Sequence, residues 1–213
     1  MINLPGDSAD YHLLTKGIEL SKDVPGLTCE IGLRAGGGTK VIIDAIAQHC
    51  PGKTHIAIDP YGNIIYEDKE NHFTRLDYTN EMRDECLKNV YAYCQEKKVN
   101  FLFFNLTDID FFERYGTGIP VYDIERRLED KYSFVFFDGP HSVNAIKTEL
   151  DFFLPRMIKG ACIAFDDVSV TDVYYNHNII HRHLLANLFT MISSTDKKAL
   201  YRYQCWGAGM RSE

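Results

Sequence analysis

Five short segments of nearly continuous apolar or β-branched residues recur along the chain, and this pattern limits the fold more than any other feature of the sequence. Residues 134–137, with the sequence FVFF, are typical of them. A strand without polar positions has to be covered on both faces, as strands are in a parallel sheet between two layers of helices. The segments are residues 27–31, 54–58, 101–104, 133–137 and 161–165. We expect them to form the central strands of such a sheet.

Apolar residues recur at about every fourth position between these segments, which is the spacing of one face of a helix. The two clearest stripes are Met82, Cys86, Val90 and Cys94, and Val143, Ile146, Leu150, Phe153 and Met157. We expect two core-facing helices, the second of which would end at Lys159-Gly160. Alternating strands and helices imply right-handed crossovers and therefore a doubly wound, Rossmann-like α/β sheet.

The end of the chain breaks this alternation. Residues 188–193 and 199–205 flank the polar residues 194–198, which is typical of an antiparallel hairpin. Together with the five segments, the hairpin predicts a sheet of seven strands, mostly parallel, in a three-layer sandwich.

The length of 213 residues suits a single domain, residues 1–213. Within it we expect a Rossmann-like core over residues 27–205, an N-terminal lid or dimer arm over residues 1–26, and a surface insertion over residues 111–127. An arm of this kind would suit a homodimer.

Charge and hydropathy disfavour several kinds of partner. Lys and Arg number 23 against 30 Asp and Glu, for a formal net charge of −7, so the overall field disfavours nucleic acid. No apolar run approaches the roughly 18 to 20 residues of a membrane helix, and the first residues lack the pattern of a secretory signal. The 6 cysteines form no CxxC pair, so we expect reduced core thiols and a cytoplasmic location.

A glycine-rich turn, residues 30–39 with the sequence EIGLRAGGGT, follows the first segment and leads into a helical run. Glycines there let a ligand approach bare backbone, while the amides at the helix start point toward it. The nucleotide patterns GxGxxG and GxxxxGK(S/T) are both absent. Glu30 would repel a phosphate but hold an amine, and Asp59, after the second segment, could accept from ribose hydroxyls. An amine and a ribose without phosphate point to S-adenosylmethionine; the alternative is a plain connection from strand to helix.

Three aspartates follow the fourth and fifth segments directly: Asp138, Asp166 and Asp167. The carboxyl ends of parallel strands meet at one edge of the sheet, so these side chains should converge there with Glu30 and Asp59. Crowded carboxylates repel one another unless a proton or a cation neutralises them. Oxygen ligands favour Mg²⁺ or Mn²⁺, which makes the three aspartates the predicted metal ligands. The alternative is that Asp166 and Asp167 cap a helix while Asp138 orders a loop.

The series Glu30-x-Gly-x-x-x-Gly-Gly-x-Thr39, Asp59, Asp138-Gly-Pro-His141 and Asp166-Asp167 resembles the class I S-adenosylmethionine-dependent methyltransferases. The likeness is greatest to a small one-domain family that includes macrocin-type O-methyltransferases. It implies that Glu30 contacts the methionine amine, that Asp59 binds the ribose, and that acids at the three later positions hold a metal in metal-dependent relatives. It also implies that three glycines make room for the cofactor: Gly32, Gly36 and Gly37.

The chain departs from this family at two places. Residues 105–108 stand where many relatives have a Gly-Asp pair near the adenine, so Thr107 is our candidate cofactor contact there, together with Asp138. Pro140 stands where relatives often have a second acid, which makes His141, beside Asp138, the first candidate for the catalytic base. A reference pKa of about 6.5 suits histidine for proton transfer near neutral pH. The alternative for His141 is a turn residue that bonds backbone.

Together these features predict methyl transfer from S-adenosylmethionine to a hydroxyl oxygen of a small molecule, with or without help from a divalent metal that lowers the pKa of the hydroxyl. Two other interpretations stay open. One is a cofactor-binding module without turnover. The other is a nicotinamide-linked oxidoreductase, against which the missing GxGxxG pattern counts.

Overall fold

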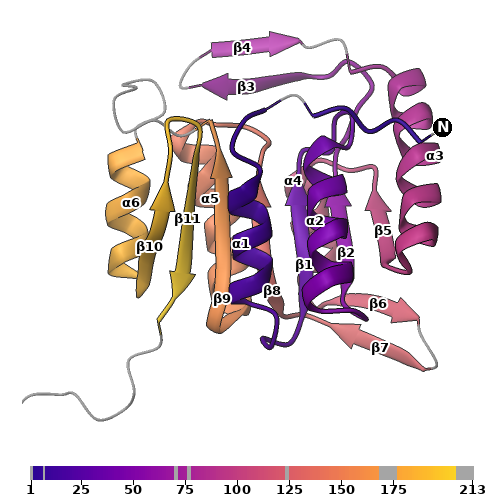
Figure 1. The fold of residues 1–213 in the computed structure, drawn as a ribbon. Coiled ribbons are helices and arrows are strands. Elements are labelled where there is room, and N and C mark those ends of the chain that lie inside the picture. Colours follow the sequence, from indigo (N-terminus) through magenta and orange to yellow (C-terminus); the bar gives the residue numbers. More distant parts are fainter. Residues whose placement is uncertain are drawn as a thin grey trace, which may run out of the picture.

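The computed structural model describes residues 2–6, 8–69, 72–75, 78–122, 125–167 and 177–204. Within these residues the chain forms a seven-stranded main sheet (Figure 1). Its strands, in spatial order, are β10 (Phe189–Ser194), β11 (Lys198–Tyr203), β9 (Met157–Asp166), β8 (Tyr132–Phe137), β1 (Leu27–Ile31), β2 (Thr54–Ile58) and β5 (Asn100–Phe104). The strands from β9 to β5 run parallel, and β11 runs antiparallel to both of its neighbours. The predicted Rossmann-like sheet with its C-terminal hairpin is confirmed.

Two layers of helices cover the sheet (Figure 1). The first layer consists of α1 (His12–Leu20), α2 (Gly37–His49) and α3 (Asn80–Lys97). The second consists of α4 (Asp108–Tyr115), α5 (Val143–Phe153) and α6 (His177–Ala186). Phe134 and Phe136 of β8 pack in the apolar cluster of the first layer, whereas Val135 and Phe137 pack in that of the second. Successive side chains thus enter opposite cores, as in a strand buried on both faces, and the predicted three-layer sandwich is confirmed.

The first helix packs against the middle of the sheet. Leu14 and Ile18 are buried on its inner face. Gly17 lies so close to Phe134 that a Cβ at this position would be 2.5 Å from the ring atom Cε2. Residues 12–20 therefore belong to a helical layer, and the lid or dimer-arm role of the segment 1–26 stays a prediction.

One predicted helix end is wrong. The stripe on α3 is buried as expected at Cys86, Val90 and Cys94. The second helix, α5, ends at Phe153, and Met157 already belongs to β9. Pro155 lies between them in a short 3-10 turn, and proline has no amide hydrogen with which to continue the helix. Lys159-Gly160 therefore lies inside a strand and does not end the helix.

Two small hairpins stand outside the main sheet. They are β3 (Ile65–Lys69) with β4 (His72–Arg75), and β6 (Ile119–Tyr122) with β7 (Arg126–Glu129). The first lies at the end toward which the parallel strands point (Figure 1). The predicted surface insertion at residues 111–127 is partly wrong, because Phe111, Ile119 and Val121 belong to the apolar core. Its glycines and proline mark turns, but the residues between them are apolar enough to be buried.

The described cysteines, namely Cys29, Cys50, Cys86, Cys94 and Cys162, are buried free thiols. Cys205 lies outside the described residues. Within the described part of the chain, none of the helices combines the length and the apolar character needed to cross a membrane.

Replacement of Gly17 by alanine should destabilise the protein, although alanine is the better helix former. The added methyl group would have to displace Phe134, and overpacking of this kind costs about 1 to 3 kcal/mol. We expect a lower melting temperature in thermal denaturation followed by circular dichroism. Lys16→Ala, at an exposed position of the same helix, is the control and should change it little. An unchanged or higher melting temperature for Gly17→Ala would contradict the packing.

Candidate functional site

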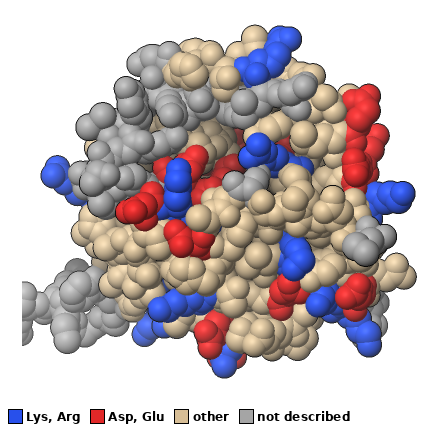
Figure 2. All heavy atoms as spheres, turned by 45° about the horizontal axis from the view of Figure 1, so that its top comes forward, with Lys and Arg blue, Asp and Glu red and all other residues tan. Residues whose placement is uncertain are grey.

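Four neighbouring parallel strands end at the same edge of the main sheet. Four residues near the ends of those strands lie side by side in register: Ile58, Ile31, Phe137 and Phe165. The residues that come next are, in the same order, Asp59, Gly32, Asp138 and Asp166. On β11, Lys198 continues the row as the direct partner of Asp166. Figure 2 looks toward this end of the molecule, where acidic and basic side chains lie next to one another around a hollow.

Glu30 is buried beneath the start of α2. Its side chain is 1% exposed, accepts a hydrogen bond from the hydroxyl of Thr39, and lies 3.8 Å from Nε2 of His55. The carboxylate also fills the space that a Cβ of Gly38 would need. The last glycine of the turn thus makes room for a side chain of the protein itself, which the sequence analysis missed. Contact between Glu30 and a cofactor amine stays a prediction.

The other glycines of the turn also lie against parts of the chain. Gly32 and Gly36 have φ angles of +90° and +83°, in the region that favours glycine. A Cβ on Gly32 would collide with the backbone carbonyl just past β8. A Cβ on Gly36 would lie 2.7 Å from Cδ2 of Leu4, and one on Gly37 would lie 2.6 Å from the carbonyl oxygen of Pro5. The N-terminal residues therefore pack against the turn, and the role of these glycines toward a cofactor is still a prediction.

Asp59 holds the glycine turn through backbone amides. Its carboxylate accepts hydrogen bonds from Leu33 (2.9 Å), Arg34 (3.0 Å) and Tyr61 (3.0 Å). Burial raises the pKa of this carboxyl, and the three amides oppose the rise. A carboxylate offers about four lone-pair positions, so three bonds to the chain leave capacity for the ribose hydroxyl predicted from the sequence.

Side-chain hydrogen bonds also order the loop after β5. Nδ2 of Asn105 donates to the carbonyl oxygens of Asp59 (3.1 Å) and Pro60 (2.5 Å). Thr107 accepts from the amide of Asp110 at 3.1 Å and so caps α4. Thr107, our candidate cofactor contact, thus has a structural role, and its contact with the cofactor stays a prediction.

A buried lysine, Lys198, lies among the acids at the strand ends. The ammonium group of Lys198 donates to Asp166 and, at 2.6 Å, to the hydroxyl of Ser8. Ser8 donates in turn to Oδ1 of Asp166 at 3.1 Å. The carboxyl of Asp138 lies within hydrogen-bonding reach of Asp166. Burial, Asp166 and Glu30 raise the pKa of Asp138 well above its ordinary value, and Lys198 opposes this rise.

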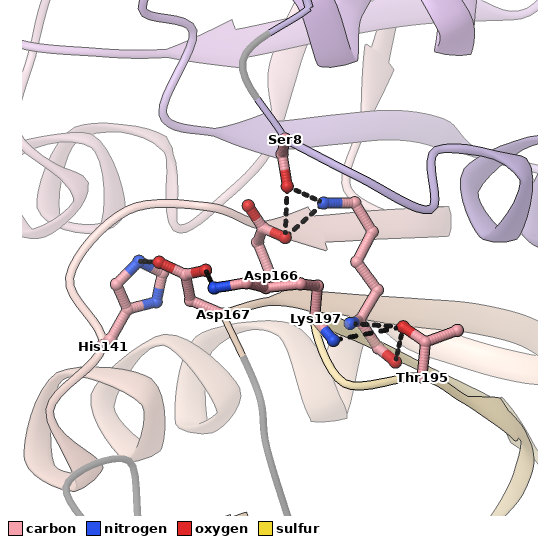
Figure 3. A network of polar contacts seen from close by, with 7 residues as sticks. Ser8, His141, Asp166, Asp167, Thr195 and Lys197 are labelled. Atoms are coloured by element: carbon pink, nitrogen blue, oxygen red, sulfur yellow. Dashed lines mark hydrogen bonds and ion pairs between the residues drawn. The ribbon is translucent and has the colours of Figure 1, made fainter. Parts of the chain in front are cut away.

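Asp167 has partners of its own. Its φ angle is +48°, and its carboxylate lies 3.4 Å from Nζ of Lys197 and 3.9 Å from Nε2 of His141. Figure 3 shows Asp166 directed toward Ser8 and Asp167 directed toward His141. The structure therefore brings His141 to the acidic edge through Asp167.

The arrangement does not fit the predicted metal site at Asp138, Asp166 and Asp167. Among the described residues, no group of three or more His, Cys, Asp or Glu side chains is placed to hold a metal ion. Asp138 and Asp166 are in contact, but Asp167 turns to other partners and Lys198 supplies a positive charge next to Asp166. Lys198 belongs to the polar residues 194–198, which the sequence pattern assigns to a turn, so only the pairing of β11 with β9 reveals its place beside Asp166.

Glu149 on α5 is a further acid that the sequence analysis missed. Its side chain is 1% exposed, and neither carboxyl oxygen has a hydrogen-bond partner in the described part of the chain. It lies near Gly139, whose Cβ would be 3.8 Å from Oε1. Burial and, second, Asp108 raise the pKa of Glu149 well above the ordinary value of 4.5. A signal existed in the sequence, because Glu149 follows Ile146 by three positions on an apolar helix face.

A mostly parallel, doubly wound sheet with acids and a glycine turn at its carboxyl edge defines the class I methyltransferases that the sequence resembles. A family model described as a methyltransferase domain matches residues 29–168, which is more than half of the chain. The chain belongs to this methyltransferase family. No curated protein matches it.

Several solved structures share the fold. CalS11, a calicheamicin methyltransferase, is 15% identical over 91% of this chain and 78% of its own, with a TM-score of 0.65. TomG from Streptomyces achromogenes, an O-methyltransferase of tomaymycin synthesis solved with S-adenosylmethionine, is 14% identical over 95% and 82%, with a TM-score of 0.58. An O-methyltransferase from Bacillus cereus solved with S-adenosylhomocysteine is 14% identical over 95% and 85%, with a TM-score of 0.59.

The substitution Glu149→Gln should stabilise the protein, and more so at higher pH. The pKa of Glu149 is raised in the folded state, so above the ordinary value of 4.5 the unfolded chain releases a proton that the folded chain keeps. The wild type therefore loses stability as the pH rises, and glutamine removes this loss. We expect a gain of about 1 to 3 kcal/mol at about pH 8 and little gain at about pH 4, measured by urea denaturation.

Glu96→Gln, at an exposed position of α3, is the matched control and should show no such trend. A gain that is the same at both pH values, or a loss at the higher one, would contradict the ionisation argument.

Proposed function

We propose that this chain is an S-adenosylmethionine-dependent methyltransferase that methylates a hydroxyl oxygen of a small molecule. The observation that carries the proposal is the convergence of Glu30, Asp59 and Asp138 on one edge of the sheet, in a chain of the methyltransferase family. TomG and the Bacillus cereus enzyme support oxygen as the acceptor atom, and their bound nucleosides support the cofactor.

The charges at this edge suit a cationic nucleoside without phosphate. Four acids lie there against one buried lysine: Glu30, Asp59, Asp138 and Asp166 with Lys198. Carboxylates attract the sulfonium and ammonium groups of S-adenosylmethionine and repel a phosphate. In this proposal Asp59 accepts from the ribose, and Glu30 holds the amine directly or through water. Thr107, which follows β5, and Asp138, which follows β8, contact the cofactor on the two sides of the pair β1 and β2.

The bound cofactor supplies an activated methyl group, so the chain mainly has to align the acceptor oxygen for in-line displacement and take up its proton. We assign the proton to the imidazole ring of His141, with Asp167, 3.9 Å from Nε2, to orient the ring and stabilise its protonated form. Asp138 follows β8 three residues before His141 and would hold the acceptor hydroxyl toward the methyl group.

The proposal includes one domain, residues 1–213, that acts in the cytoplasm, where the described thiols would stay reduced. The contacts of Leu4 and Pro5 with the glycine turn favour a lid over an arm for the N-terminal segment. A homodimer is compatible with either role.

Isothermal titration calorimetry should detect binding of S-adenosylmethionine and of S-adenosylhomocysteine at a stoichiometry of about one per chain. Titration with NADH and NADPH is the control and should give no binding heat. Binding of a nicotinamide nucleotide in place of either nucleoside would overturn the proposal in favour of an oxidoreductase.

Substitution of His141 by glutamine should lower kcat by about 10²- to 10⁴-fold, because the chain would lose the group that accepts the hydroxyl proton. The dissociation constant of S-adenosylhomocysteine should stay the same, since His141 acts on the acceptor. Release of S-adenosylhomocysteine with a panel of phenols and sugars gives the rate. His49→Gln, at the end of α2, serves as the control. A kcat unchanged by His141→Gln would exclude His141 as the base.

A further inference from the structure

We propose that Lys198 takes the place of a divalent cation at the carboxyl edge of the sheet, so that this chain works without a metal ion. The proposal deepens the proposed function and rests on it for its catalytic consequence. Its structural part rests on contacts of Lys198 that do not depend on which reaction is catalysed.

The position of Lys198 is determined by backbone pairing. In the antiparallel ladder of β9 and β11, Lys198 lies directly opposite Asp166, so the two side chains share one face of the sheet. Tyr11 and Phe136 present their rings to the ammonium group at 4.8 Å and 5.6 Å. Lys198 has no exposed side-chain surface. It is therefore part of the packed interior beside the acids, with a rigidity that an exposed lysine lacks.

The protein already supplies a positive charge that neutralises acids at this edge. A buried ammonium group requires a charged or polar partner, and Lys198 has Asp166 and the hydroxyl of Ser8. Asp138 is in contact with the same Asp166. A divalent cation bound to this pair would have to displace the ammonium group or lie beside it, where like charges repel.

The third predicted metal ligand is engaged elsewhere. Asp167 lies 3.4 Å from Lys197 and 3.9 Å from His141. Mg²⁺ demands nearly octahedral coordination by oxygen atoms at short distance. Two neighbouring carboxyls, one of them bound to a lysine, with the third turned to a different pair of partners, do not provide it.

Lys198 is then a positioning residue for the proposed reaction. It holds Asp166, and through Asp166 it holds Asp138 next to the acceptor. Ser8 connects the N-terminal segment to the same pair. The acceptor hydroxyl would be oriented by the protein alone.

The test is a titration with Mn²⁺ followed by electron paramagnetic resonance, which measures the free ion. The full-length wild type, with and without S-adenosylhomocysteine, should bind no Mn²⁺ at Asp166. Lys198→Met keeps the length of the side chain but removes its charge, and it should bind Mn²⁺ at least tenfold more tightly than the wild type. Lys198→Arg keeps the charge and should behave as the wild type.

Lys197→Met is the matched control, because it removes an adjacent positive charge that contacts Asp167 and should create no Mn²⁺ site. Wild-type binding of one Mn²⁺ that is abolished by Asp166→Asn would overturn the proposal, and this measurement does not require Lys198→Met to fold. If circular dichroism shows that Lys198→Met is folded, its failure to gain Mn²⁺ would also overturn it.

A third measurement separates this proposal from the proposed function. Wild-type turnover should be the same in EDTA and in added Mg²⁺, and loss of turnover in EDTA would overturn the proposal. Calorimetry with S-adenosylhomocysteine on the same samples tests the cofactor alone. Absence of nucleoside binding would overturn the proposed function and leave the Mn²⁺ result intact.

Discussion

Backbone pairing of β1 with β2 on one side and β8 on the other is the constraint on which the rest of the structure depends. It places Ile31 beside both Ile58 and Phe137. A slip of one residue would turn Glu30 into the opposite core and move every apolar side chain of β1 to the wrong face. Burial of β1 on both faces prevents this slip. The ends of the neighbouring strands, and with them the acids, are positioned by the same ladders.

The acidic side chains at this edge already have hydrogen-bond partners within the protein before any ligand binds. Asp59 accepts three backbone amides, and Glu30 accepts the hydroxyl of Thr39. Asp166 has Lys198 and Ser8. Hydrogen bonds to carboxylates hold these side chains in one orientation, which lowers the entropy that a ligand would have to remove on binding. Substitutions here would change folding as well as ligand binding, so the two effects have to be measured separately.

The sheet could be predicted from the sequence because each central strand has its own apolar segment, and the ends of those segments identify the acids. The side chains that the acids contact could not be predicted from the sequence. Nothing local distinguishes Lys198 from the exposed Lys197 beside it, and its partner Asp166 is on another strand. Gly36 and Gly37 are predicted to make room for the cofactor, whereas Leu4 and Pro5 lie against them. Such contacts join distant parts of the chain and leave no periodic signal.

The hydrogen bond from Lys198 to Ser8 spans 190 positions of the chain. During synthesis, the amino-terminal residues and the glycine turn leave the ribosome many seconds before β11, at about 5 to 20 residues per second. Until then Asp166 has no counter-charge, and the sheet lacks the strand that β9 pairs with on its outer side. The hairpin of β10 and β11 therefore completes the carboxyl edge of the sheet. A chain interrupted before this hairpin would carry the glycine-rich turn but would lack the lysine that balances the charge of Asp166.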